Sequence, residues 1–209
     1  MPKALILVAD GSEEIEFVTP YDVLTRAGFE VISAGVNLKE YYAQYVPVAT
    51  SMLGISMTRN VRIIPDFPTL LSLGDKSVHE HYDILILPGG GPGAKTFASS
   101  EPVLDMINAF QTAGKHVAAI CAGTTALVAA QKKHGGDKSR VTSHPSVRGE
   151  VEKKGGWEYS EERVVVDGKV ITSRGPGTAL LFALTIVEAL AGKEKRDEVA
   201  SPMVVAETL

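Results

Sequence analysis

Short runs of apolar residues alternate with helical patterns along most of this 209-residue chain. Four of these runs are almost continuously apolar, which is typical of strands that a sheet buries on both faces. They cover residues 3–9, 29–35, 82–91 and 116–121. Because strands that alternate with helices form parallel sheets, the pattern predicts an α/β fold, with a doubly wound, mostly parallel sheet sandwiched by helices.

Capping residues and turn signals place the remaining elements. Thr19 is expected to cap a helix that starts at Pro20 and ends before Gly28. Asp167 and Gly168 mark the turn of a β-hairpin over residues 163–172, in the C-terminal half. The other expected elements are an extended pair within 53–64, helices over about 100–113, from Thr124 and over 175–192, and a short strand over 139–145.

The composition, with 44% hydrophobic and 22% charged residues, is that of one globular domain spanning residues 1–209. A formal net charge of −4 argues against nucleic acid as a partner. The first apolar run meets Asp10 too soon for a secretion signal, and no run is long enough to span a membrane. The single cysteine excludes an intrachain disulfide and a Cys-rich zinc site. We therefore expect a cytoplasmic protein, which could also enter the nucleus.

Two segments fit no clear pattern. Residues 37–49 hold three tyrosines within five positions, and residues 68–82 are partly helical and contain His79 and His81. Two neighbouring histidines seldom form a metal site on their own, so a solvated turn is the expected structure for the second segment.

The single cysteine, Cys121, stands where an apolar run ends and a helical pattern begins. A lone cysteine after apolar residues is more often a small core residue than a nucleophile. However, small neighbours at 122 and 123 suit a sharp strand-to-helix turn that exposes a nucleophile, and the helix start near Thr124 favours a thiolate. On this hypothesis the pKa of Cys121 would fall to roughly 5–6, against about 8.5 for a free cysteine.

The glycine-rich segment 87–94 follows another predicted strand and allows three interpretations. Gly89, Gly91 and Ala94 fit a degenerate phosphate-binding pattern, although the next strand ends in Cys121 rather than in a ribose-binding acid. The glycines could instead serve a turn with positive φ. Alternatively, backbone N–H groups of this turn form an oxyanion hole beside the thiol.

Glu16 and His144 also follow predicted strands. Each has an ordinary structural explanation, since a glutamate near a helix start favours the helix dipole and a histidine before proline is usually a loop residue. Because ligands bind at the carboxyl ends of parallel strands, both side chains could join Cys121 in a thiol–imidazole–carboxylate set.

Five motifs together resemble the ThiJ/PfpI superfamily, most closely its parkinsonism-associated DJ-one type, which includes protein deglycases and glutathione-independent, glyoxalase III-like enzymes. The motifs occur in the family's order between residue 3 and about residue 195. They are ADGSEEIEFVTPYDVLTRAG, LPGGGPGA, AAICAGTTAL, VTSHPSVRG and TSRGPGTALLFALTIVEALAGKE. The resemblance implies a flavodoxin-like sheet and a homodimer.

By position, the resemblance makes Cys121 the reactive cysteine, Glu16 its protonated hydrogen-bonding partner and His144 the neighbouring histidine. It also implies backbone donors at Gly89, Gly90 and Ala122, and pocket or dimer-contact arginines at Arg59 and Arg174. Two departures exclude other branches. Related cysteine peptidases have histidine where Ala122 stands, and class I glutamine amidotransferases have glutamate where Ser146 stands.

The resemblance thus predicts a cofactor-independent lyase (D-lactate dehydratase class) that converts methylglyoxal and similar 2-oxoaldehydes to lactate through a hemithioacetal on Cys121. Deglycation of early glyoxal adducts on proteins or nucleotides would use the same residues. The alternative is an oxidative-stress sensor or a protective, chaperone-like protein in which Cys121 is oxidised to the sulfinate.

Overall fold

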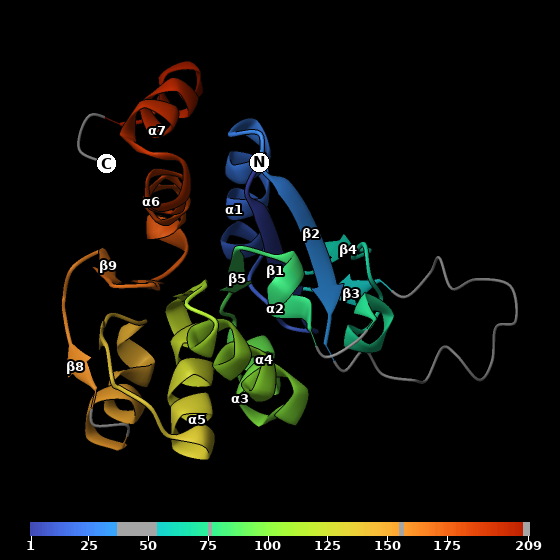
Figure 1. Cartoon of the computed structure of the whole chain (residues 1–209), viewed down its shortest axis with the longest axis vertical. Coiled ribbons are helices and arrows are strands. Elements are labelled where there is room, and N and C mark those ends of the chain that lie inside the picture. The colour runs from blue at the N-terminus through green and yellow to red at the C-terminus, as the bar shows by residue number, and fades with distance from the viewer. Residues whose placement is uncertain (37–53, 75–76, 155–156, 207–209) are drawn as a thin grey trace, which may run out of the picture.

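The computed structural model describes residues 1–36, 54–74, 77–154 and 157–206. Its centre is a six-stranded sheet in the order β2-β1-β5-β6-β10-β9. All neighbours in this sheet are parallel except β9 and β10. The strands are β1 (Lys3–Val8), β2 (Glu30–Gly35), β5 (Ile84–Leu87), β6 (His116–Ile120), β9 (Val164–Asp167) and β10 (Val170–Ser173). The predicted doubly wound, mostly parallel sheet is confirmed (Figure 1).

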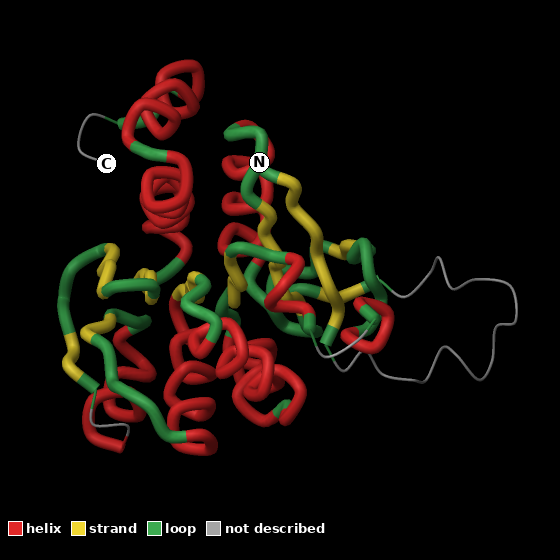
Figure 2. The backbone as a smooth tube through the Cα atoms, in the orientation of Figure 1, coloured by secondary structure: helices red, strands yellow, loops and turns green. Residues whose placement is uncertain are grey.

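Helices cover both faces of this sheet, so that strand and helix layers alternate (Figure 2). One face carries α1 (Glu14–Arg26), α6 (Ala179–Ala191) and α7 (Lys193–Ala200), and the other carries α3 (Gly91–Ser99), α4 (Glu101–Thr112) and α5 (Thr124–His134). Successive residues of β1 point to opposite faces, and all of them after Lys3 are buried. Leu5 and Leu7 belong to one apolar cluster, and Ala4, Ile6 and Val8 to the other. Burial on both faces explains why the strand sequences are continuously apolar.

The predicted hairpin over 163–172 is confirmed as β9 and β10, with Gly168 at a φ of 57° in the turn. The predicted extended pair within 53–64 forms the small antiparallel sheet of β3 (Ile55–Ser56) and β4 (Arg62–Ile63). The strand predicted over 139–145 is shorter than expected. Only β7 (Arg140–Val141) pairs, with β8 (Glu158–Tyr159), so His144 lies on the following loop.

The helix predicted to start at Pro20 in fact begins at Glu14, and Pro20 lies inside it. A side-chain oxygen of Glu13 accepts the backbone N–H of Glu16 at 2.9 Å and caps the helix. The sequence signal at Thr19 was therefore misleading, because a carboxylate six residues earlier satisfies the free N–H groups. This correction places Glu16 in the first turn of α1.

Two further helices, α3 and α7, were not anticipated. Each follows a glycine that the sequence analysis took for a turn or a helix end, Gly90 at a φ of 83° and Gly192 at 88°. A glycine with positive φ can end one element and start the next without a connecting loop. The start of α3 consequently lies directly beside the predicted site.

Of the two segments without a clear pattern, residues 37–49 lie outside the described residues. The second is partly helical as expected, with a 3₁₀ turn at Leu70–Leu73 and α2 at Val78–His81. Within the described ranges, no group of three or more histidine, cysteine or acidic side chains is placed to hold a metal ion. No helix in these ranges has the length and apolar character needed to cross a membrane.

Three parallel neighbours in the sheet, β1, β5 and β6, end at the same edge. The loops after β1 and β5 are joined by hydrogen bonds from Glu13 N–H to the Gly89 carbonyl, 3.1 Å, and from Gly93 N–H to the Gly11 carbonyl, 3.3 Å. The loop after β6 begins with Cys121. The fold therefore gathers the predicted site residues from three distant parts of the sequence at one sheet edge.

Candidate active site

Cys121 has a strained backbone at the end of β6. Its φ is 64°, a value that L-residues other than glycine seldom adopt and that costs on the order of 1 kcal/mol. A 3₁₀ turn over Cys121–Gly123 then leads directly into α5. A Cβ at position 123 would lie 2.6 Å from the Leu87 carbonyl oxygen, so this turn needs glycine there. The geometry is that of a nucleophile elbow, with Cys121 as a whole 8% exposed.

Glu16 reaches the thiol from the first turn of α1 and is completely buried. Its Oε2 accepts the Gly89 N–H at 2.8 Å, and its carboxyl group interacts with the Cys121 side chain. Oε1 is buried and has no hydrogen-bond partner among the described residues. An ionised carboxylate would leave this oxygen uncompensated away from water, so the arrangement favours the protonated acid.

The loop after β5 is tightly packed between these two side chains. A Cβ at Gly89 would lie 2.6 Å from Glu16 Oε2 and 2.7 Å from the Cys121 Cβ. No residue other than glycine fits between the acid and the nucleophile without moving one of them. At Gly90 a Cβ would lie 2.2 Å from the Gly11 carbonyl oxygen, and the φ of 83° also requires glycine. Close packing and positive φ thus account for the first two glycines of the glycine-rich segment.

The acid and the thiol titrate as a pair, which carries one negative charge once its first proton is lost. Burial raises the pKa of Glu16 to about 7, although hydrogen bonds from Cys121 and Gly89 oppose the rise. Burial, followed by the nearby Glu16 carboxylate, raises the pKa of Cys121 to about 12, while backbone hydrogen bonds from Ala122 and Gly90 lower it. The lowered thiol pKa expected from the sequence is therefore not what this site produces beside an ionised Glu16. The pair loses its first proton near neutral pH. The second proton is lost only at a much higher pH, because its loss would place two negative charges side by side.

The three predicted backbone donors divide between two acceptors. Ala122 and Gly90 hydrogen-bond the sulfur. The N–H of Gly89 points instead to the carboxyl of Glu16. Gly89 thus orients the acid, whereas the other two donors stabilise negative charge on the thiol and on an atom bonded to it.

His144 is attached to the same turn through its backbone. Its N–H donates to the Cys121 carbonyl at 3.2 Å, and its ring lines the cavity above the thiol. Its Nδ1 lies 2.8 Å from Ser146 Oγ and accepts the Ser146 N–H at 3.2 Å. The sequence hypothesis of a thiol–imidazole–carboxylate set is thus met in location. The acid contacts the thiol, as the resemblance implied, and the imidazole contacts Ser146.

A cavity of about 600 Å³ opens over these groups. Helix α3 forms one wall, the loop after β7 forms another, and the turn between β3 and β4 contributes a third. The side chains and backbone that line it include Glu13, Glu16, Arg59, Gly90, Lys95, Cys121, Thr125, His144, Ser146 and Glu150. A volume in this range holds a small organic substrate.

The two predicted arginines lie in different places. Arg59 lines the cavity, because buried Glu14 accepts hydrogen bonds from Thr58 Oγ1, at 2.6 Å, and from the Arg59 N–H. Burial raises the pKa of Glu14, but these hydrogen bonds outweigh it and the net shift is downward. Arg174 forms an ion pair with Glu161 at 2.8 Å and is absent from the described cavity lining.

Sequence reasoning missed the supporting residues Glu14, Thr58 and Ser146. Glu14 stands in the acidic motif after β1, and that motif was the only available signal for it. Ser146 stands two residues after His144, where the sequence analysis used it only to exclude glutamine amidotransferases, and nothing in the sequence connects Thr58 to the site; both act through contacts that only the folded chain creates.

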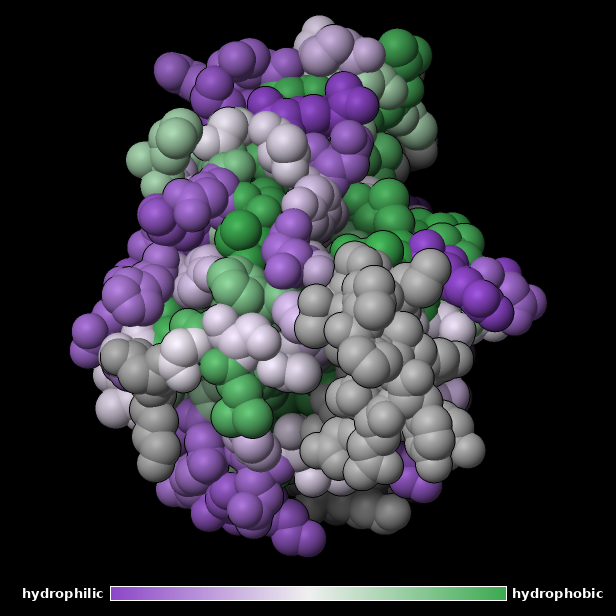
Figure 3. All heavy atoms as spheres, turned by 90° about the vertical axis from the view of Figure 1, so that its right-hand side faces the viewer, coloured by the Kyte–Doolittle hydropathy of each residue, from purple (hydrophilic) through white to green (hydrophobic). Residues whose placement is uncertain are grey.

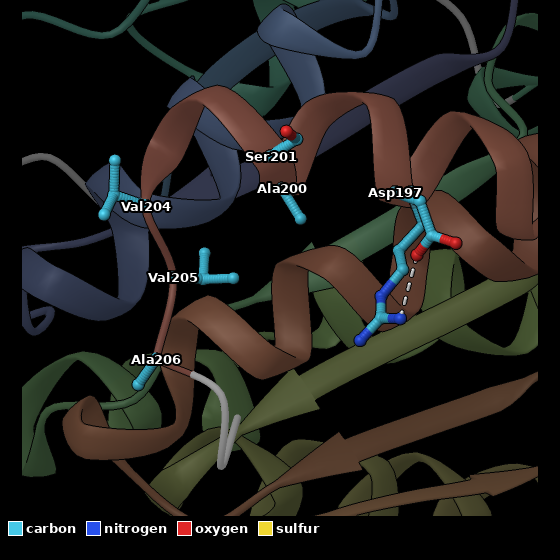
Figure 4. Close-up of a pocket in the computed structure, with 7 residues that line it drawn as sticks. Asp197, Ala200, Ser201, Val204, Val205 and Ala206 are labelled. Carbon is cyan, nitrogen blue, oxygen red and sulfur yellow. Dashed lines mark hydrogen bonds and ion pairs between the residues drawn. The ribbon is translucent and has the colours of Figure 1, made fainter.

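A second cavity lies beside α7, away from this edge of the sheet (Figure 4). It is lined by Arg196, Asp197, Ala200, Ser201 and residues 204–206. Its two charged side chains pair with each other at 3.1 Å. With its charges already paired, it offers no reactive group comparable to Cys121.

Comparison with known proteins agrees with this geometry. A model of the DJ-1/PfpI family matches residues 2–189. The chain belongs to the DJ-1/PfpI family. Its relatives include Parkinson disease protein 7 homolog of Danio rerio, 41% identical over 97% of both chains. The glutathione-independent glyoxalase DJ-1 of Schizosaccharomyces pombe is 36% identical over 95% of this chain and 96% of the relative. Glutathione-independent glyoxalase DJR-1.2 of Caenorhabditis elegans is 35% identical over 97% and 95%.

Solved structures of DJ-1/PfpI proteins have the same fold. Schizosaccharomyces pombe DJ-1 superposes with a TM-score of 0.83 at 32% identity, covering 98% of this chain and all of the other. Drosophila melanogaster DJ-1beta gives a TM-score of 0.79 at 38% identity, covering 98% of each.

Proposed function

We propose that this chain is a glutathione-independent glyoxalase, which converts methylglyoxal and related 2-oxoaldehydes, with water, to 2-hydroxy acids such as lactate. Two relatives of nearly equal length are named glutathione-independent glyoxalases. The observation that carries the proposal is the completely buried Glu16 beside Cys121, with a pKa raised to about 7. A carboxyl with such a pKa donates and accepts protons at neutral pH.

In the first step the Cys121 sulfur attacks the aldehyde carbon, C1, of the substrate. The Glu16 carboxylate takes the thiol proton as the new C–S bond forms and the C1–O π bond opens, and the resulting alkoxide then takes that proton from Glu16. The backbone donors of Gly90 and Ala122 stabilise the developing negative charge. The product of this step is a hemithioacetal beside an ionised Glu16.

In the second step Glu16 removes the hydrogen on C1 as a proton and returns it to C2. Electrons flow from the C1–H bond into an enediol and then to C2, so C1 is oxidised and C2 is reduced without an external acceptor. The proton on the C1 oxygen passes by way of His144 to the oxygen on C2, which leaves a thioester carbonyl at C1 and a hydroxyl at C2. The resulting thioester is cleaved by water, which releases the hydroxy acid and restores the thiol. Every step uses protein groups and water.

The same residues would remove early glyoxal adducts from amino groups of proteins or nucleotides. That activity begins with the same attack by the thiol, so the two activities use one site and differ only in the substrate. Oxidation of Cys121 to the sulfinate in a stress sensor is the competing role, since the backbone donors that stabilise a thiolate also stabilise an oxidised anion.

The proposal includes a cytoplasmic homodimer. On α1, Ile15 and Val18 lie one turn apart and are 50% and 48% exposed. Beside them Ile64, which follows β4, is 66% exposed and lines a groove with Val18 and Tyr21. Figure 3, which views the molecule from the side of β2, β3 and β4, shows apolar areas beside charged ones. Such contiguous apolar surface supports a second copy as its partner.

The deciding experiment is steady-state turnover of methylglyoxal by the wild type and by Cys121→Ser, with lactate measured as the product. We expect turnover by the wild type and none above background by the variant. A wild type that makes no lactate, while its thiol is readily oxidised to the sulfinate, would replace the glyoxalase proposal with the sensor.

A further inference from the structure

Two backbone hydrogen bonds fix the position of His144. Its N–H is bonded to the carbonyl of Cys121, and its own carbonyl accepts the Val147 N–H at 3.0 Å. The ring is therefore anchored to the same turn that holds the nucleophile. What remains undetermined by the backbone is the rotation of the ring and the nitrogen that carries its proton.

Ser146 determines both through two contacts to one nitrogen. Its hydroxyl oxygen lies 2.8 Å from Nδ1, and its backbone N–H points at the same atom from 3.2 Å. A backbone N–H can only donate. Nδ1 must therefore present its lone pair, because a proton on Nδ1 would face the proton of the Ser146 N–H.

Because Nδ1 carries no proton, it cannot donate to the Ser146 hydroxyl, and the hydroxyl therefore donates to Nδ1 as well. The neutral ring then carries its proton on Nε2. His144 lines the cavity over Cys121, so we take its Nε2 N–H as the group offered to a bound substrate.

We propose that Ser146 is a positioning residue that holds His144 as the Nε2–H tautomer, so that the imidazole donates a hydrogen bond to the substrate oxygen on C2. This inference rests on the proposed glyoxalase function for the identity of the substrate, but the tautomer itself does not depend on turnover. It divides the chemistry between two residues. Glu16 moves the proton between the carbons, and His144 stabilises the charge on the second oxygen.

The first test is spectroscopic. In ¹⁵N-labelled protein at a pH of about 8, above the ordinary histidine titration range, we expect Nδ1 of His144 to resonate as unprotonated and Nε2 as protonated. The His144 signals are assigned as those lost in His144→Ala. In Ser146→Ala only the backbone N–H at 3.2 Å still holds Nδ1, so the two nitrogens should move part of the way toward averaged values, and Ser146→Thr should restore the wild-type pattern.

The second test is kinetic. Losing one hydrogen bond to Nδ1 should lower kcat roughly 3- to 10-fold in Ser146→Ala, with KM within about twofold of wild type. Ser146→Thr keeps the hydroxyl and should recover most of the loss. Ser201→Ala, an exposed serine beside the second cavity, is the matched control and should leave kcat unchanged. In a His144→Ala background, Ser146→Ala should cause no further loss, since its effect passes through the ring.

Three results would overturn the proposal: a protonated Nδ1 in the wild type, an unchanged His144 spectrum in Ser146→Ala, or an equal loss of kcat with and without His144. A wild type without turnover would refute the glyoxalase function instead, and the spectra of wild type and Ser146→Ala would still decide the role of Ser146.

Discussion

Replacing Glu16 by glutamine tests the proposed acid–base group with the smallest possible change in shape. The amide keeps an oxygen that can accept the Gly89 N–H, now 2.8 Å from Oε2, and offers an N–H₂ to the sulfur. The substitution removes the ionisable carboxyl proton that Glu16 exchanges in the proposed mechanism. We therefore expect kcat to fall about 10²-fold or more, the usual contribution of a positioned proton-transfer residue, while the fold remains intact.

The same substitution makes a prediction about stability. A carboxyl whose pKa rises from 4.5 to about 7 on folding is protonated in both states at low pH. Between these two values the unfolded chain ionises and the folded chain does not, so the wild type loses stability as pH rises, and the loss is complete above about 7. At about 1.4 kcal/mol per pH unit the loss is on the order of 3 kcal/mol. Glutamine cannot ionise, so Glu16→Gln escapes this loss.

Urea unfolding of both proteins at several pH values between 4 and 8 measures the effect. The free energy of unfolding of Glu16→Gln, relative to that of the wild type, should rise by on the order of 3 kcal/mol between pH 4.5 and pH 7. A difference that stays constant across this range would refute the raised pKa of Glu16. Retained turnover in Glu16→Gln would refute its role as the proton carrier, and His144→Ala would then be the next variant to assay. Thiol alkylation should persist in Glu16→Gln, which separates lost chemistry from a lost nucleophile.

Three further predictions concern the thiol, the glycine-rich loop and the dimer. Iodoacetamide alkylation of wild-type Cys121 should rise with pH through about 7, where the acid–thiol pair loses its first proton, and a midpoint below about 6 would contradict the sharing of charge with Glu16. Gly89→Ala should abolish turnover and lower stability by about 1–3 kcal/mol, since its Cβ would lie 2.6 Å from Glu16 Oε2, whereas Gly91→Ala, with no atom within 4 Å, should unfold like the wild type. Val18→Glu should convert a dimer to a monomer in analytical ultracentrifugation, and a wild type that is already monomeric would remove the dimer proposal.

The sequence by itself determined the architecture. The short, continuous apolar runs within residues 3–9, 82–91 and 116–121 favoured strands buried on both faces, because helices cover both sides of a parallel sheet. The turn at Gly168 determined the hairpin, because its signal is local. The position of Cys121 at a strand end, and the motifs that surround it, were enough to indicate the site and the family.

Only the tertiary structure decided the chemistry within that site. Glu16 is 73 positions from Gly89 in the sequence, and its hydrogen bond, its burial and its raised pKa exist only because the first turn of α1 meets the loop after β5 and the turn at Cys121. For the same reason the sequence did not show that the thiol titrates together with this acid. A helix dipole and small neighbours are visible in a sequence, whereas burial beside a carboxylate is not. Which nitrogen of His144 carries the proton likewise depends on the angle at which one serine meets the ring, because a hydrogen bond depends on distances and directions that residue order alone does not specify.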